Sequence, residues 1–209
     1  MSFELWLAFV VSSAVLLAIP GPTILTVISY SMAHGSRANL PLVAAVALGD
    51  STALAFSLLG LGTLLSASTV LFTLVKWVGG LYLIYLGVKL FRQGMRAGEL
   101  TLPSVPSALK GVFLNTYLVT ALNPKGIVFF VAFLPQFIDP RSEPNRQLWM
   151  LAISFVCLAI VNAFCYAYFA SFARRVLSTG RAQKVFSIVG GGLLGSAGVW
   201  ALFARRPGE

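Results

Sequence analysis

The sequence predicts an all-α membrane protein with six transmembrane helices, arranged as two inverted three-helix repeats. Composition gives the first indication: 58% of the 209 residues are hydrophobic and only 10% are charged, whereas soluble domains carry about 25% charged residues. The second is a set of six apolar runs separated by polar segments. The third is a proline break in the first run and another in the fourth, at Pro20 and Pro124, which are 104 positions apart.

Each apolar run is long enough to cross the hydrocarbon core of a bilayer, since about 20 helical residues span ~30 Å. Short connections join the first run to the second and the second to the third, which predicts antiparallel hairpins. The runs cover residues 3–30, 40–65, 70–91, 113–137, 148–172 and 185–203.

A polar stretch near the middle of the chain divides the six runs into two sets of three. It contains Pro103 and Pro106 and predicts a linker over residues 92–112. A first repeat then covers residues 1–91 and a second covers 113–209. Because three is an odd number, the second repeat enters the membrane with the opposite orientation, which makes the repeat inverted.

Small residues recur at matching places in the third and sixth runs. Such residues let helices approach closely in lipid, so they favour a packing face over a substrate-lining role. The matching residues are Gly79, Gly80 and Gly87 in the third run and Gly190, Gly191 and Gly198 in the sixth.

The distribution of lysine and arginine predicts the orientation in the membrane. Nine of these residues lie in or beside the loops after the first, third and fifth runs, and four lie on the other side. Short loops rich in Lys and Arg stay in the cytoplasm, so the linker is expected there and both termini outside. The acidic start of the chain, with Glu4, does not fit a cleaved signal peptide. The nine are Arg37, Lys89, Arg92, Arg96, Lys110, Arg174, Arg175, Arg181 and Lys184, and the four are Arg141, Arg146, Arg205 and Arg206.

The break in the fourth run combines three residues that are ill suited to a plain membrane helix. Pro124 lacks an N–H and its ring clashes with the carbonyl four residues earlier, and Asn123 before it is pushed away from the helical region. Lys125 brings a charge to a depth where insertion costs about 2.5–3.5 kcal/mol. Broken backbone at that depth is tolerated only within protein or beside a water-filled cavity, so these residues are candidates for a binding site.

The break in the first run has the same character and falls at the corresponding place of the first half. Here Pro20, Gly21, Pro22 and Thr23 follow one another within an apolar run. Interrupted hydrophobic segments at corresponding places of two halves point to the binding site of a transporter. These four residues are therefore further candidates for substrate binding.

Two charges lie near the middle of apolar runs, Asp50 in the second and Lys125 in the fourth. A buried charge without a partner is costly, and two interpretations stay open. The two residues form a structural ion pair that fixes how the helices pack, or they hold a charged substrate and, at Asp50, a coupling proton. Asn162 in the fifth run is another polar candidate, either as a hydrogen-bond donor between helices or as a residue that lines the site.

Several function classes lack the residues they need. No metalloprotease, phosphate-loop or Cys–His signature is present and the chain has one histidine, so no enzyme activity, cofactor or metal site is predicted. Cys157 and Cys165 would lie about 12 Å apart along a helix, too far for a disulfide. The net charge of +9 is explained by orientation in the membrane rather than by nucleic-acid binding.

A set of short motifs follows a characteristic order along the chain. The motifs are Pro20-Gly21-Pro22, His34-Gly35-Ser36-Arg37, Gly49-Asp50, Lys76-Trp77, Gly79-Gly80, Tyr82-Leu83, Asn123-Pro124-Lys125 and Phe133-Leu134-Pro135-Gln136-Phe137. Together they resemble the lysine-exporter (LysE) family, in particular its homoserine/threonine-resistance branch of bacterial amino-acid exporters. This resemblance covers nearly the whole chain. It implies a six-helix amino-acid exporter of the bacterial cytoplasmic (inner) membrane, driven by proton antiport, and it chooses no single amino acid.

These observations lead to a mechanism for a zwitterionic substrate. The half-helix N-termini after Pro20 and Pro124, reinforced by Lys125, would face the carboxylate, and Asp50 would receive the ammonium group or an exchanged proton. Rocking of the two halves would alternate access to the site. The alternatives are a metal-ion exporter, for which the chain has few ligands, and a lipid-handling or scaffold membrane protein. Assembly as a homo-oligomer stays open.

Overall fold

The structure, a computed structural model, describes residues 1–67, 69–95, 111–139, 142–170 and 180–203. Within these residues every regular element is helical, which confirms the all-α prediction. The elements are α1 (Phe3–Ala18), α2 (Pro22–His34), η1 (Gly35–Ala38), α3 (Asn39–Ala67), α4 (Thr69–Met95), α5 (Val112–Ala121), α6 (Pro124–Val128), η2 (Phe129–Phe133), η3 (Leu134–Phe137), α7 (Pro144–Tyr168) and α9 (Gly180–Phe203).

Three helical stretches in the described part of the chain are long and apolar enough to cross a membrane: Pro22–Gly60, Val112–Phe137 and Pro144–Tyr168. The α4 helix continues to Met95, and residues 96–110 of the expected linker lie outside the described residues. So do seven of the basic residues that predict the orientation, namely Arg96, Lys110, Arg141, Arg174, Arg175, Arg205 and Arg206.

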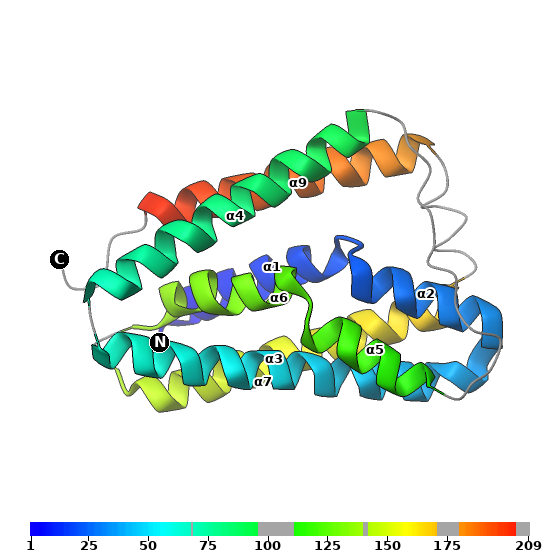
Figure 1. The fold of residues 1–209 in the computed structure, drawn as a ribbon, viewed down its shortest axis with the longest axis horizontal. Helices are drawn as coiled ribbons and strands as arrows, with labels where there is room; N and C mark the ends of the chain where they lie inside the picture. Colours follow the sequence, from blue (N-terminus) through cyan, green and yellow to red (C-terminus); the bar gives the residue numbers. More distant parts are fainter. Residues whose placement is uncertain (68, 96–110, 140–141, 171–179, 204–209) are drawn as a thin grey trace.

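The helices form two parts, which lie one above the other in Figure 1. One part is the antiparallel pair of α4 and α9. The other contains α1, α2, α3, α5, α6 and α7, in which α3 packs against both α5 and α7. The α1 and α2 helices follow one another in one direction, and α5 and α6 follow one another in the opposite direction. Both junctions lie near the centre of the molecule (Figure 1).

Glycines allow α4 and α9 to touch backbone to backbone. A Cβ atom built on Gly87 would lie 2.6 Å from the carbonyl oxygen of Gly191, and one built on Gly198 would lie 2.7 Å from that of Gly80. No side chain fits at such distances, so the close contact requires glycine. The packing face expected from the matching glycines is therefore the interface between these two helices.

A cluster of phenylalanines fills the space between α1, η2 and α7. The rings of Phe9 and Phe137 have centroids 5.3 Å apart, and those of Phe130 and Phe155 are 4.7 Å apart in an edge-to-face arrangement. Phe9, Phe130 and Phe155 are almost completely buried. Because η2 directly follows the end of α6, this packed cluster helps to position α6 relative to α1.

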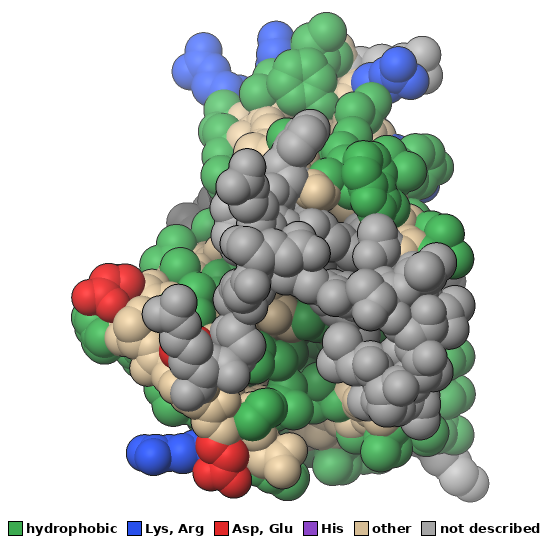
Figure 2. Space-filling view, turned by 90° about the vertical axis from the view of Figure 1, so that its left-hand side faces the viewer, with side chains coloured by type: hydrophobic (Ala, Val, Ile, Leu, Met, Phe, Trp, Pro, Cys, Tyr) green, Lys and Arg blue, Asp and Glu red, His purple; other side chains and the backbone are tan. Residues whose placement is uncertain are grey.

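Many charged side chains apart from Asp50 and Lys125 lie at the margins of the molecule. Figure 2 shows a face with many hydrophobic side chains, with Lys and Arg at its upper edge and with both acidic and basic side chains toward its lower left. The η1 segment, the end of α4 and the start of α9 all lie at one end of the molecule (Figure 1). These segments carry Arg37, Arg92 and Lys184. The orientation in the membrane stays a prediction.

Candidate functional site

The junction between α1 and α2 follows from two prolines around one glycine. Ile19, the residue before the first proline, leaves the helix with extended backbone angles (φ −72°, ψ 115°). Gly21 is the N-cap of α2, and Pro22 occupies its first turn, where a missing N–H is harmless. Consequently α1 ends with carbonyls that have no partner inside the helix, and α2 begins with N–H groups that have none.

The junction between α5 and α6 has the same plan and adds a side-chain cap. Asn123 is extended (φ −69°, ψ 110°), and its side chain accepts a hydrogen bond of 3.1 Å from the Lys125 N–H. Pro124 occupies the first turn of α6, which passes directly into the π-helical segment η2. Such π-helical turns are frequent at functional sites.

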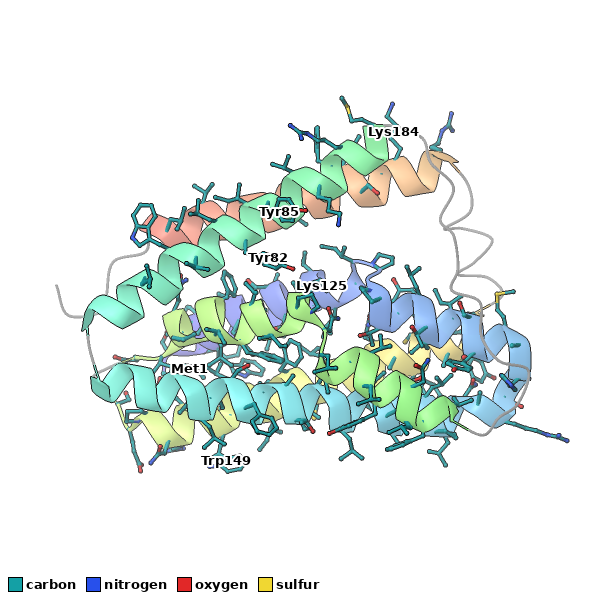
Figure 3. The ribbon with its side chains drawn as sticks, in the orientation of Figure 1. Met1, Tyr82, Tyr85, Lys125, Trp149 and Lys184 are labelled. Carbon is teal, nitrogen blue, oxygen red and sulfur yellow. The ribbon has the colours of Figure 1, made fainter. Side chains whose placement is uncertain are left out.

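The two junctions are joined by side chains. The Asn123 amide donates to the Thr23 hydroxyl over 3.1 Å. The Lys125 ammonium donates to the carbonyl oxygens of Leu16 and Ile19, over 2.9 Å each. Figure 3 shows Lys125 at the start of α6, near the centre of the molecule. Residues from the two halves of the chain thus form one polar centre.

Side chains of α7 complete the capping of α1. The Asn162 amide donates to the Leu17 carbonyl over 3.2 Å, and the Tyr166 hydroxyl donates to the Ala18 carbonyl over 2.8 Å. Lys125 donates to the carbonyls on either side of this pair, those of Leu16 and Ile19. Four successive carbonyls therefore each accept a bond from a side chain. An unpaired carbonyl in a bilayer costs several kcal/mol, so these bonds stabilise the junction. Tyr166 was not predicted; its signal in the sequence is its position one helical turn after Asn162.

Asp50 lies beside the second junction. Asp50 is 7% exposed. Its Oδ1 would lie 4.0 Å from a Cβ atom built on Gly126, which is in the first turn of α6. The neighbouring Gly49 packs so closely on the last turn of α5 that a Cβ there would lie 2.7 Å from the Cβ of Thr120. The α3 helix therefore crosses the chain where α5 gives way to α6.

Asp50 and Lys125 interact electrostatically across this centre. Among the residues that the structure describes, however, no hydrogen bond or ion pair involves the Asp50 carboxylate, and the ammonium is bound by α1 instead. The direct ion pair, one of the two interpretations left open by the sequence, is therefore not formed in this structure.

All nine residues predicted for the site lie in the two junctions or on helices that reach them. The prolines shape the backbone and donate no hydrogen bond. A Cβ on Gly21 would lie 3.4 Å from the Lys125 Nζ, so a larger residue there would crowd the ammonium. The junctions contain Pro20, Gly21, Pro22, Thr23, Asn123, Pro124 and Lys125, while Asp50 and Asn162 reach them from α3 and α7. In the described part of the chain, no group of three or more His, Cys, Asp or Glu side chains is placed to hold a metal ion.

Comparison with known proteins shows the family. The family model of the LysE type translocator matches residues 14–205. The chain belongs to the LysE family. This agrees with the resemblance seen in its motifs, and the long apolar helices make this LysE family member a multi-pass membrane protein.

Similar proteins cover most of the chain. Membrane protein YrhP of Bacillus subtilis is 30% identical over 201 residues, which cover 92% of this chain and 96% of the relative. The homoserine/homoserine lactone efflux protein of Salmonella typhimurium is 32% identical over 167 residues, covering 80% and 81%. The leucine efflux protein of Klebsiella pneumoniae is 29% identical over 208 residues, covering 96% and 93%. No solved structure gives a significant match.

Proposed function

We propose that this LysE family member exports amino acids from the cytoplasm across the bacterial inner membrane. Relatives are named for the efflux of homoserine, homoserine lactone and leucine, and each of these compounds carries a primary amine. The observation that carries the proposal is the pair of opposite buried charges, Asp50 and Lys125, which lie near each other without forming an ion pair. A zwitterion offers each of them a partner of opposite sign.

Lys125 retains capacity for the substrate carboxylate. An ammonium group has three donors, and Lys125 uses two of them on the carbonyls of α1. The α2 helix adds a second source of donors, because it begins at Gly21 without a side-chain cap. Free N–H groups and the positive end of a helix both favour a carboxylate. Asp50, on the other side of the first turn of α6, would face the ammonium group.

The transport cycle would use two inverted three-helix repeats, residues 1–91 and 113–209, with a cytoplasmic linker between them. The order of the elements supports this organisation, because an interrupted helix followed by two long helices occurs twice. The first set is α1–α2, α3 and α4, and the second is α5–α6, α7 and α9. Rocking of the halves around the junctions, placed near the bilayer midplane, would open the site to each side in turn.

Asp50 is our candidate for coupling to protons. Ionisable groups inside membranes commonly mark proton relays, and the carboxylate has no hydrogen bond within the described residues. A carboxylate that holds a proton at one stage and an ammonium group at another would exchange protons against amino acids. This gives the antiport suggested by the family resemblance.

The test is efflux from proteoliposomes. Vesicles that contain the purified protein would be loaded with labelled amino acids, including leucine and homoserine, and followed with and without a proton gradient. We expect release of at least one amino acid, faster with the gradient. Protein-free vesicles and the variant Lys125→Met serve as controls. Release of no amino acid above the controls would contradict the proposal, and release of divalent cations instead would support a metal-ion exporter.

A further inference from the structure

The carbonyl ends of the two interrupted helices have different partners. At the end of α1, four successive carbonyls accept bonds from side chains. At the end of α5, the Leu118 carbonyl accepts a bond from the Leu122 N–H (3.0 Å) and the Thr120 carbonyl accepts one from the Asn123 N–H (3.1 Å). No side chain among the described residues donates to this end of α5. The end of α1 is therefore closed by side chains. We call the end of α5 open because, in the described part of the chain, only backbone N–H groups bond to its carbonyls.

The closed end shows which chemistry such a junction binds. Its central ligand is a primary ammonium, the Lys125 Nζ, which bridges the carbonyls of Leu16 and Ile19 at 2.9 Å. The C-terminal end of a helix carries a partial negative charge and unpaired acceptors, so it attracts a cation that has N–H donors. The open end of α5 offers the same kind of acceptor.

Asp50 is the independent observation that points to a ligand at the open end. It is 93% buried, since its residue is 7% exposed, and within the described residues no hydrogen bond or ion pair reaches its carboxylate. Its neighbour Gly49 places α3 against the last turn of α5, where a Cβ on Gly49 would lie 3.0 Å from the carbonyl oxygen of Tyr117. Lys125 acts on this carboxylate electrostatically but does not donate to it. A buried carboxylate without a hydrogen-bond donor is costly, so this position is suited to a cation with N–H donors that comes from outside the chain.

We propose that the ammonium group of the transported amino acid binds between Asp50 and the open carbonyl end of α5, as Lys125 binds at the end of α1. This inference rests on the proposed function and specifies how its substrate is recognised. It requires two properties of the substrate nitrogen. A positive charge satisfies Asp50, and N–H donors satisfy the carbonyls, which accept bonds only from donors.

Derivatives of one amino acid separate these two requirements. The probe is the amino acid that the proteoliposome panel exports fastest, in competition with its N-acetyl and N,N,N-trimethyl derivatives loaded on the same side. The N-acetyl derivative keeps the carboxylate and loses the charge, whereas the trimethyl derivative keeps the charge and loses every N–H. We expect both to inhibit efflux at least about tenfold more weakly than the unlabelled parent, since each lacks one of the required interactions.

Variants assign the charge requirement to Asp50. In Asp50→Asn, measured by substrate exchange without a proton gradient, we expect the apparent affinity for the parent to fall by about tenfold or more, while the weak inhibition by the N-acetyl derivative stays unchanged. The control is Glu4→Gln, which removes an exposed carboxylate at the start of α1 and should change neither value. The inhibitor series on the unmodified protein decides the question even where Asp50→Asn fails to fold.

Three results would overturn the inference while export itself stands. Inhibition by the N-acetyl derivative equal to that by the parent would show that the ammonium is not recognised. Equal inhibition by the trimethyl derivative would exclude the carbonyls of α5 as ligands. Efflux that requires sodium would indicate that this end of α5 holds a metal ion instead. If the panel shows no amino-acid export at all, the proposed function fails first and this inference fails with it.

Discussion

At the scale of single residues, Lys125 combines a structural contact with a charge. Its ammonium closes the end of α1 by bonds to Leu16 and Ile19, and we propose that its third donor binds the substrate. Tyr166 makes the same kind of contact with the same helix end, at Ala18, and has no charge. The two residues therefore allow the structural contribution to be separated from the proposed role in transport.

We expect Lys125→Met to reduce efflux by about tenfold or more and to lower stability as well. The variant leaves two carbonyls without donors, each costing about 1–3 kcal/mol, and it removes the charge that we propose binds the substrate carboxylate. Tyr166→Phe removes one hydrogen bond and should lower stability by about as much as the loss of one Lys125 bond. Its efflux should stay within about twofold of that of the unmodified protein. Efflux per amount of protein in the membrane, together with thermal unfolding in detergent, measures both. Normal efflux by Lys125→Met at normal membrane levels would rule out the substrate role.

Asp50→Asn should abolish efflux driven by a proton gradient, while exchange of substrate at saturating concentration survives. The amide keeps the shape of the side chain and cannot take up and release a proton. Gradient-driven efflux between about pH 5.5 and 8 should depend on pH in the original protein and should be absent from the variant at every pH. The same pH dependence and the same rate of efflux in both proteins would show that Asp50 is not the coupling residue and that its role is structural.

The sequence indicated which residues meet at the two junctions better than it indicated their partners. Prolines and charges within apolar runs are conspicuous, so Asp50, Asn123 and Lys125 could be found by inspection. The actual partners of Lys125 are backbone carbonyls, which every residue has and which leave no mark in a sequence. The choice between those carbonyls and Asp50 depends on distances across helices, and these exist only in the folded chain.

At the scale of whole elements, the junctions could be predicted because proline acts on its own turn of helix. The pairing of α4 with α9 depends on contacts between distant segments. Matching glycines indicated a packing face on each of these helices but did not show that the two faces meet each other. The π-helical form of η2 was not predicted, although Pro135 follows η2 by two residues and lacks the N–H that an α-helix would bond to the Val131 carbonyl.

Substitution of glycine by alanine tests the α4–α9 interface. We expect Gly87→Ala to lower the thermal unfolding temperature in detergent, because its Cβ would lie 2.6 Å from two backbone atoms of α9. In the control Gly192→Ala, on α9 itself, the new methyl group would meet nothing within 4 Å. That variant should unfold at the same or a higher temperature, since alanine is the better helix former. Equal effects of the two substitutions would show that the close contact is absent.

At the scale of the whole molecule, the predicted orientation places both termini outside and η1 in the cytoplasm. Single cysteines at Ser2 and Ser36, both exposed, would test it in a protein whose Cys157 and Cys165 are replaced by alanine. A membrane-impermeant thiol reagent added to intact cells should label Ser2→Cys and leave Ser36→Cys unlabelled until the cells are opened. The reverse pattern would show that the loops rich in lysine and arginine lie outside the cell, against the expected rule.

The capping of α1 also constrains the order of events during synthesis. The four carbonyls at residues 16–19 leave the ribosome more than 100 residues before Lys125, and Asn162 and Tyr166 follow later still. Until those side chains arrive, the end of α1 must rely on water or on the insertion machinery for its hydrogen bonds, since lipid offers none. A chain that stops after the first repeat should therefore be degraded rapidly in cells, and co-expression of the missing repeat as a separate chain should prolong its lifetime.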